Sequence, residues 1–208
     1  GWAMFGSLSF VPLFVQAVLG TSATSAGSTL TPMLLGWVGS SIIGSRALLY
    51  TSYRTIVLIG SVLLTLGAFL MTRATSDVTQ LQLMINLGLM GVGMGFAVSP
   101  FLIAVQSYVK RRDMGAATST LTFSRSIGGT LGVSVMGAVL SARLASALLA
   151  AGLDPDTVSL NSLLDPLASS NAAAGLNGTL RDALAISMQS VFLIAFVAAA
   201  LALLVSLL

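Results

Sequence analysis

The sequence predicts an all-α polytopic membrane protein with six transmembrane helices. Hydrophobic residues make up 56% of the chain and charged residues only 7%, with a mean hydropathy of +0.99. A water-soluble domain needs more polar surface than this composition supplies. The nine basic and six acidic residues lie between or at the ends of six long apolar stretches, except for Arg125, which lies inside one. The stretches are continuously apolar, which favours helices over the alternating strands of a membrane β-barrel.

Each apolar stretch is long enough to cross a bilayer, which takes roughly 20 residues for a hydrocarbon core about 30 Å thick. We predict spans at about 4–19, 27–45, 55–72, 80–109, 115–140 and 183–208. The remaining residues form short connections, except for an extracytoplasmic loop at about 141–181. Two Asp-Pro pairs in this loop, at Asp154 and Asp165, predict one or two short surface helices, because Asp suits an N-cap and Pro the first helical position.

The basic residues predict the orientation of the chain. They cluster in the second and fourth connections, which the positive-inside rule places in the cytoplasm. The residues concerned are Arg46, Arg54, Lys110, Arg111 and Arg112, with Asp113 beside the last three. We therefore expect a plasma-membrane protein with both ends of this chain cytoplasmic. The pI of about 10 does not indicate nucleic-acid binding, because the basic residues form no single face and aromatic residues do not interleave with them.

The composition also argues against enzymatic chemistry. The chain has no cysteine and no histidine, so no metal site and no cofactor are expected. No nucleophile and base are positioned to converge, so we predict no catalytic residue. The chain enters an apolar span directly after Gly1 without a signal-peptide pattern, and we expect it to be a fragment of a longer protein.

The fifth predicted span places Arg125 on a face of mostly small residues. At 100° per residue this face also carries Thr118, Thr122, Gly129, Gly132 and Met136. Small residues mark close contact between membrane helices, so Arg125 should face protein or a water-filled cavity. It lies roughly 15 Å from the cytoplasmic end, where an unpaired charge costs at least a few kcal/mol. Two interpretations remain open: a substrate-pathway or gating charge, or a structural lock satisfied by helix-end carbonyls.

The fourth predicted span has a glycine face and a proline. Gly88, Gly91 and Gly95 share one stripe, which predicts close packing against a neighbouring helix. Pro100 removes a backbone hydrogen bond and is expected to kink the span.

Three amide side chains complete the candidate substrate pathway. Gln16 and Asn86 lie near the outer ends of their spans and could line a cavity or face the membrane interface. Gln106 lies on the glycine stripe of the fourth span.

Four stretches resemble the major facilitator superfamily, and within it the fourteen-helix drug:proton antiporters of the EmrB/QacA type. The strongest match is the fifth span, where Arg125-Ser126-Ile127-Gly128-Gly129 is similar to the family's Arg-x-x-Gly-Gly helix. The others are Pro12-Leu13-Phe14-Val15-Gln16 in the first span, Pro100 to Asp113 around the fourth connection, and Arg181-Asp182-Ala183-Leu184 at the last span. The second connection departs from the family pattern, with Leu49 where Asp is usual and Ser52 where Gly is usual.

The resemblance implies that residues 1–208 form the C-terminal six-helix half of a transporter. Such a protein exports hydrophobic or amphipathic small molecules, such as drugs or secondary metabolites, by proton antiport and alternating access. Its expected partners are the small-molecule substrate, protons, membrane lipid and the N-terminal helix bundle of the same protein. No predicted span has Asp or Glu in its interior, so we expect the proton-coupling group in the N-terminal half. The alternative is a self-assembling six-helix scaffold or channel subunit without active transport.

Overall fold

The computed structural model describes residues 1–75, 77–150 and 178–207, and every regular element in these ranges is a helix. The α-helices are α1 (Trp2–Ala17), α2 (Ala23–Thr29), α3 (Thr31–Ala47), α4 (Tyr53–Thr72), α5 (Gln80–Tyr108), α6 (Met114–Ala150) and α9 (Gly178–Leu207). A short 3₁₀ helix, η1 (Arg111–Asp113), precedes α6. The prediction of an all-α polytopic chain is confirmed.

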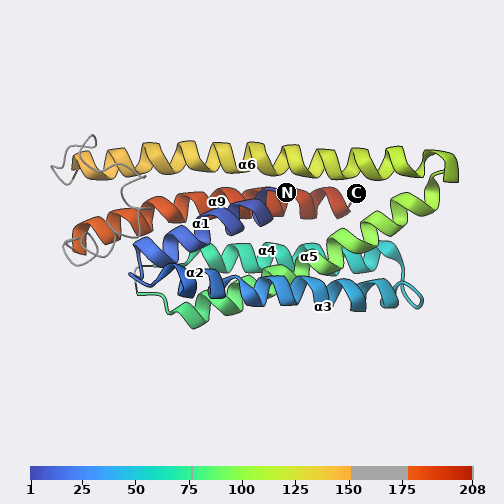
Figure 1. Cartoon of the computed structure of the whole chain (residues 1–208), viewed down its shortest axis with the longest axis horizontal. Coiled ribbons are helices and arrows are strands. Elements are labelled where there is room, and N and C mark those ends of the chain that lie inside the picture. The colour runs from blue at the N-terminus through green and yellow to red at the C-terminus, as the bar shows by residue number, and fades with distance from the viewer. Residues whose placement is uncertain (76, 151–177, 208) are drawn as a thin grey trace.

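The long helices run side by side along the longest axis of the molecule (Figure 1). The connections α3–α4 and α5–α6 lie at the right-hand end of that view, toward which α9 also runs. Arg46 and Arg54 flank the α3–α4 connection, and Lys110, Arg111 and Arg112 lie in the α5–α6 connection. We call this end of the molecule the basic end. The connections α1–α2 and α4–α5 lie at the opposite end. The two basic connections therefore lie on the same side of the bundle.

Four helical segments in the described residues are long and apolar enough to cross a membrane. They are Tyr53–Thr72, Gln80–Tyr108, Arg111–Leu149 and Leu184–Leu207. The helix at the first predicted span, α1, is apolar but has only 16 residues. The second predicted span, at 27–45, is divided into α2 and α3 at Leu30. Pro32 in the first turn of α3 has no N–H to continue the hydrogen bonds of α2.

Helix α6 contains the fifth predicted span and continues to Ala150, past the predicted end of that span at 140. The added residues are mostly helix-favouring Ala and Leu. Leu144 and Leu148 follow Leu140 at helical spacing, and all three are buried. The continued apolar face therefore extends the helix into the region predicted as loop. The surface helices predicted at Asp154 and Asp165 lie outside the described residues.

Helix α5 occupies the centre of the packing, between α3 and α4. Its contact with α3 is backbone to backbone, because a Cβ on Gly91 would lie 2.1 Å from the Met33 carbonyl oxygen. On the other side, a Cβ on Gly93 would lie 2.3 Å from the Leu64 nitrogen and 2.7 Å from the Gly60 oxygen. Glycines on two faces of one helix thus let both neighbours approach closely, as van der Waals packing in lipid requires.

The buried core lies toward the end opposite the basic end. The rings of Phe14 in α1 and Phe192 in α9 meet edge to face, with centroids 5.9 Å apart. Met90 of α5 and Leu140 of α6 are buried in the same cluster. By contrast, no residue in 111–128, at the basic end of α6, is buried. Helix α6 therefore packs against the other helices toward the end opposite the basic end and is exposed toward the basic end.

Candidate functional site

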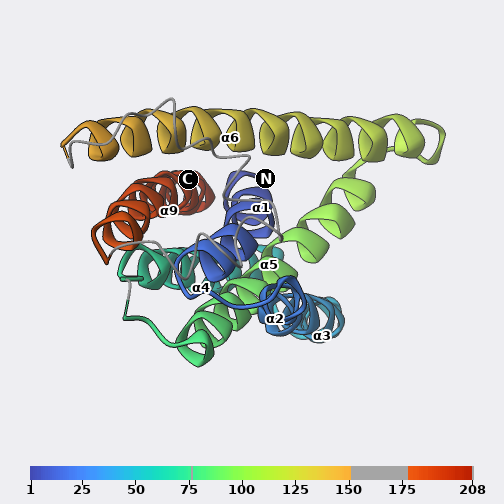
Figure 2. The same cartoon turned by 60° about the vertical axis from the view of Figure 1, so that its left-hand side comes forward.

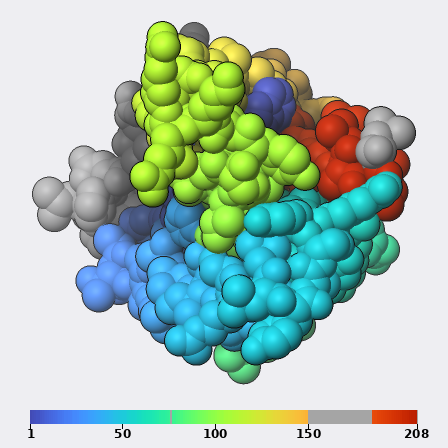
Figure 3. Space-filling view, turned by 90° about the vertical axis from the view of Figure 1, so that its right-hand side faces the viewer, coloured from blue at the N-terminus to red at the C-terminus, as the bar shows by residue number. Residues whose placement is uncertain are grey.

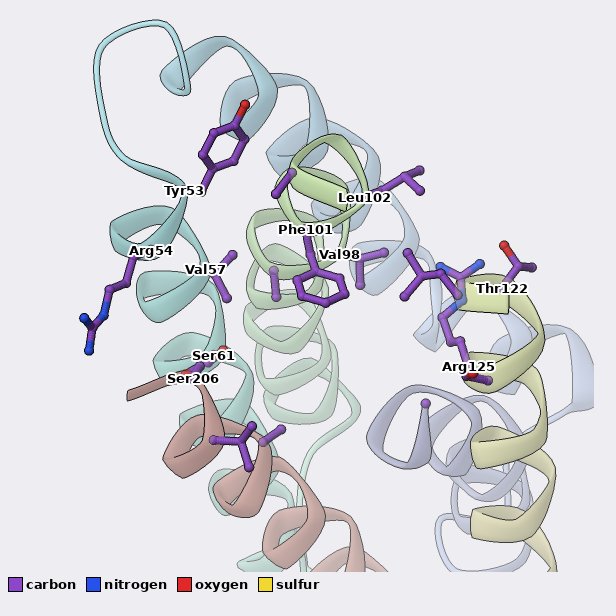
Figure 4. Close-up of a pocket in the computed structure, with 17 residues that line it drawn as sticks. Tyr53, Arg54, Val57, Ser61, Val98, Phe101, Leu102, Thr122, Arg125 and Ser206 are labelled. Carbon is purple, nitrogen blue, oxygen red and sulfur yellow. The ribbon is translucent and has the colours of Figure 1, made fainter. Parts of the chain in front are cut away.

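A cavity of about 700 Å³ lies in the half of the bundle nearest the basic end. Helices α4, α5, α6 and α9 provide most of its walls, as the close-up in Figure 4 shows. Apolar side chains predominate, and hydroxyl groups of Ser61, Thr122 and Ser206 are interspersed among them. Cavities of this size with a few placed polar groups are typical of small-molecule sites.

The cavity forms because α5 diverges from α4 and α9 to reach α6. On the N-terminal side of Pro100, the contact between Gly60 and Gly93 holds α4 and α5 together. Beyond it, α5 runs obliquely toward the start of α6 (Figure 2), and Gln106 Nε2 donates a hydrogen bond of 3.2 Å to Thr118 Oγ1 on α6. Pro100 has no N–H to donate to the carbonyl of the preceding turn, so α5 lacks one backbone hydrogen bond at this point.

Arg125 lines this cavity and also a second one of about 350 Å³ between α3, α5 and α6. Its side chain is half-buried and runs back along α6 toward Thr122 (Figure 4). Val98 and Leu102 of α5 also line both cavities. In the part of the chain that the structure describes, the guanidinium has neither an ion-pair partner nor a hydrogen bond to a helix-end carbonyl. Arg125 is therefore a half-buried charge at the junction of two cavities.

The contact between α1 and α6 sets the position of Arg125. A Cβ on Gly129 would lie 2.3 Å from the Phe5 ring, and one on Gly132 would lie 2.8 Å from Trp2 Cγ. Both glycines thus allow aromatic side chains of α1 to pack directly on the α6 backbone. Gly129 is one helical turn beyond Arg125, so this contact holds the arginine at the cavity wall.

The other candidate pathway residues lie apart from Arg125. Gln16 donates to the Pro12 carbonyl of its own helix, at 3.3 Å. Asn86 lines a separate cavity of about 290 Å³ at the opposite end, together with Arg73 and Asp77. Gln106 is engaged by α6 as described above. The structure thus places only Arg125, of the four candidates, on the wall of the large cavity.

Figure 3 shows the basic end of the molecule facing the viewer, with the segments around residues 50 and 110 at the surface. Arg54 lines the cavity and donates a hydrogen bond to the Leu207 carbonyl near the end of α9. Arg46 lies in the last turn of α3, where a positive charge is favourable at a helix C-terminus. Lys110, Arg111 and Arg112 are exposed beside Asp113. In the described ranges, no group of carboxylates could hold a metal ion.

Comparison with known proteins gives several relatives. The chain is 33% identical over 175 residues to the multidrug transporter protein MdtP of Bacillus subtilis, an alignment that covers 84% of this chain and 31% of that protein. It is 41% identical over 130 residues to multidrug resistance protein 3 of the same organism, covering 62% and 25% respectively. It is 30% identical over 203 residues to the MFS-type transporter clz4 of Cochliobolus lunatus, covering 97% of this chain and 34% of that protein. No family model matches the chain.

The chain belongs to the major facilitator superfamily. Its relatives are named as transporters and efflux pumps, so the family is one of transporters and not of enzymes. This major facilitator chain spans about a third or less of the length of the relatives described above.

The structure of this major facilitator chain also reveals polar contacts that the sequence pattern did not single out. The Ser41 and Ser99 hydroxyls lie 2.5 Å apart and join α3 to α5 beside the second cavity. At the opposite end, Gln80 Nε2 donates to Thr29 Oγ1 at 2.8 Å and to the Ser25 carbonyl at 3.0 Å, joining α5 to α2. Ser99 shares the glycine stripe of α5, which was a signal for a contact with a neighbouring helix, but a serine in a helix can also bond a carbonyl of its own helix.

Proposed function

We propose that this chain forms the C-terminal six-helix half of a fourteen-helix drug:proton antiporter that exports amphipathic small molecules across the plasma membrane. The observation that carries the proposal is the large, mostly apolar cavity beside Arg125 at the basic end. Family membership and relatives named as multidrug transporter and aspyridones efflux protein support it. The remainder of such a transporter would supply the other wall of the cavity.

The shape of the bundle supports an alternating-access cycle. The buried part of α6 lies away from the basic end, and its residues 111–128 at the basic end are not buried. The positive-inside rule assigns the basic end to the cytoplasm. This arrangement corresponds to a half-bundle open to the cytoplasm. Substrate would enter at the basic end, and rocking of the two bundles would then open the opposite end.

Proton coupling requires a titratable group whose protonation changes between the two states. Three Asp residues lie in the described ranges and none is in the middle of a helix: Asp77 lies between α4 and α5, Asp113 in η1 and Asp182 near the start of α9. We therefore assign the coupling carboxylate to the N-terminal bundle.

The experiment uses everted membrane vesicles from efflux-deficient cells that produce the full-length protein containing this chain. Vesicles are energised with an imposed proton gradient, and uptake of neutral, anionic and cationic amphipathic dyes is followed by fluorescence. We expect gradient-dependent uptake of at least one dye, which an uncoupler abolishes. Uptake no greater than in vesicles without the protein would refute the proposed transport.

The same vesicles test the assignment of coupling. A variant in which all six Asp residues of this chain are replaced by Asn should keep the gradient dependence of the wild-type protein. Loss of that dependence in a variant that is inserted normally would place the coupling group in this half instead.

The size of the native polypeptide distinguishes a transporter half from a self-assembling six-helix protein. An antibody to residues 154–180 should detect a band more than twice the 21.2 kDa of this chain. A band close to that mass would favour the scaffold or channel subunit.

A further inference from the structure

We propose that the cavity at the basic end binds amphipathic organic anions, with the anionic group at Arg125 and the apolar body between α4, α5 and α9. As a statement about cargo, this inference rests on the efflux function proposed above. As a statement about binding, it rests on the charges and shape of the site.

The charges that line the cavity are all positive. Among the described lining residues of the two adjoining cavities, the ionisable side chains are those of Tyr53, Arg54 and Arg125, and none is Asp or Glu. Arg54 is engaged by the Leu207 carbonyl at the end of α9. Asp77 lines the cavity at the opposite end of the bundle and so cannot neutralise Arg125. Within the described part of the chain, the site therefore offers a cation without a counter-ion.

The position of Arg125 strengthens its attraction for an anion. It is half-buried inside a span, at the place where two cavities meet. Charge–charge attraction is several times stronger in such surroundings than in bulk water, and a cation taken out of water without a partner is costly. An entering anion supplies the missing partner. A guanidinium also matches a carboxylate or sulfonate geometrically, because it can donate two parallel hydrogen bonds.

The walls next to Arg125 suit an apolar body. Phe101 and Leu102 of α5, Leu121 of α6, Val57 of α4 and Val205 of α9 line the cavity of about 700 Å³. A fused aromatic ring system with a short chain fits within this volume. On the walls that the described residues of this chain supply, a lipophilic cation of the same shape would meet like charge and no carboxylate, which disfavours it.

The experiment compares two probes that share one apolar body: 1-pyrenebutyrate and 1-pyrenebutyltrimethylammonium. The full-length protein is reconstituted in nanodiscs of phosphatidylcholine, and binding is measured by quenching of protein tryptophan fluorescence, with empty nanodiscs subtracted. Trp37 lines the second cavity and lies close to the proposed site. We expect the anion to bind about tenfold more tightly than the cation, or better. Equal affinity, or preference for the cation, would overturn the proposal.

Three variants assign the preference to Arg125. Arg125→Gln should weaken binding of the anion about tenfold and leave the cation unchanged or tighter, whereas Arg125→Lys should keep most of the preference. Arg143→Gln is the matched control, because Arg143 is an exposed arginine of the same helix that lines neither cavity. Equal loss of both probes in Arg125→Gln, with the lysine variant equally impaired, would show a structural role and overturn the proposal.

A further arm distinguishes a free organic anion from an anionic lipid. If phosphatidylglycerol in the nanodisc displaces pyrenebutyrate from the wild type, the site takes anionic lipid, and if it does not, the site takes a free anion. Both outcomes retain the anion site. The two proposals can fail independently. A protein that binds the anion through Arg125 but transports no dye would support the anion site and refute the proposed efflux. A protein that transports cations and binds the anion no more tightly than the cation would keep the efflux proposal and lose this inference.

Discussion

Replacement of Gly91 by alanine is expected to destabilise the bundle, because it inserts a methyl group between two helix backbones. The new Cβ would lie 2.1 Å from the Met33 carbonyl oxygen and 2.8 Å from the Met33 carbonyl carbon. These are backbone atoms of α3, so no side-chain rotation can relieve the overlap. A comfortable carbon-to-oxygen contact is about 3.3 Å, so α3 and α5 must separate locally by roughly 1 Å.

The expected cost follows from that separation. A gap of this size forfeits a substantial part of the dispersion energy along the contact, and overpacking in close-packed interiors costs about 1–3 kcal/mol. Replacement of a glycine by alanine in a helix interior by itself stabilises the folded state by about 0.5–1 kcal/mol. The net loss for Gly91→Ala should therefore lie between about 0 and 2.5 kcal/mol, and the difference from a glycine whose Cβ meets no obstacle should be about 1–3 kcal/mol.

Two other glycines provide matched controls. A Cβ on Gly88, on the same stripe of α5, would make an ordinary contact of 3.5 Å with Pro32, and one on Gly39 in α3 would meet nothing within 4 Å. Both alanine variants should be as stable as the wild type or slightly more stable. The assay is unfolding of the purified full-length protein in mixed detergent micelles with increasing dodecyl sulfate. If Gly91→Ala unfolds at the same detergent fraction as Gly88→Ala, the close approach of α3 and α5 is wrong.

Two further predictions concern contacts that join helices. The chain has no cysteine, so the pair Ser41→Cys and Ser99→Cys can be introduced into an otherwise cysteine-free full-length protein, where it should form a disulfide efficiently on mild oxidation. The control pair Ser41→Cys and Ile59→Cys should not, because Ile59 lies on the exposed face of α4. The reverse pattern would contradict the α3–α5 arrangement. Gln80→Ala removes the side chain that joins α5 to α2, and this should lower the free energy of unfolding by about 1–3 kcal/mol in the same assay. An unchanged unfolding midpoint would show that water replaces these hydrogen bonds without loss of stability.

Parts of the candidate site could be predicted from sequence because they follow from local chemistry. The placement of Arg125 among small residues in the middle of a span was readable from helical periodicity alone. The amides were less informative, since a glutamine such as Gln16 can bond its own helix, and nothing local distinguishes that outcome from a place on a cavity wall. Gln106 depends on Thr118 of α6, whose distance from it is set by the path of α5.

The sequence by itself determined that lipid is the solvent, that the chain is helical, and which two connections carry the basic charges. These properties depend on composition and on residues close together in the chain, through the cost of exposing polar groups to hydrocarbon. Only the tertiary structure decided that α5 lies between α3 and α4, that Gly91 is in far closer contact than Gly88, and that two cavities meet at Arg125. In lipid, helix association depends on van der Waals fit between surfaces distant in sequence. That fit involves pairs of surfaces, so neither helix alone encodes it.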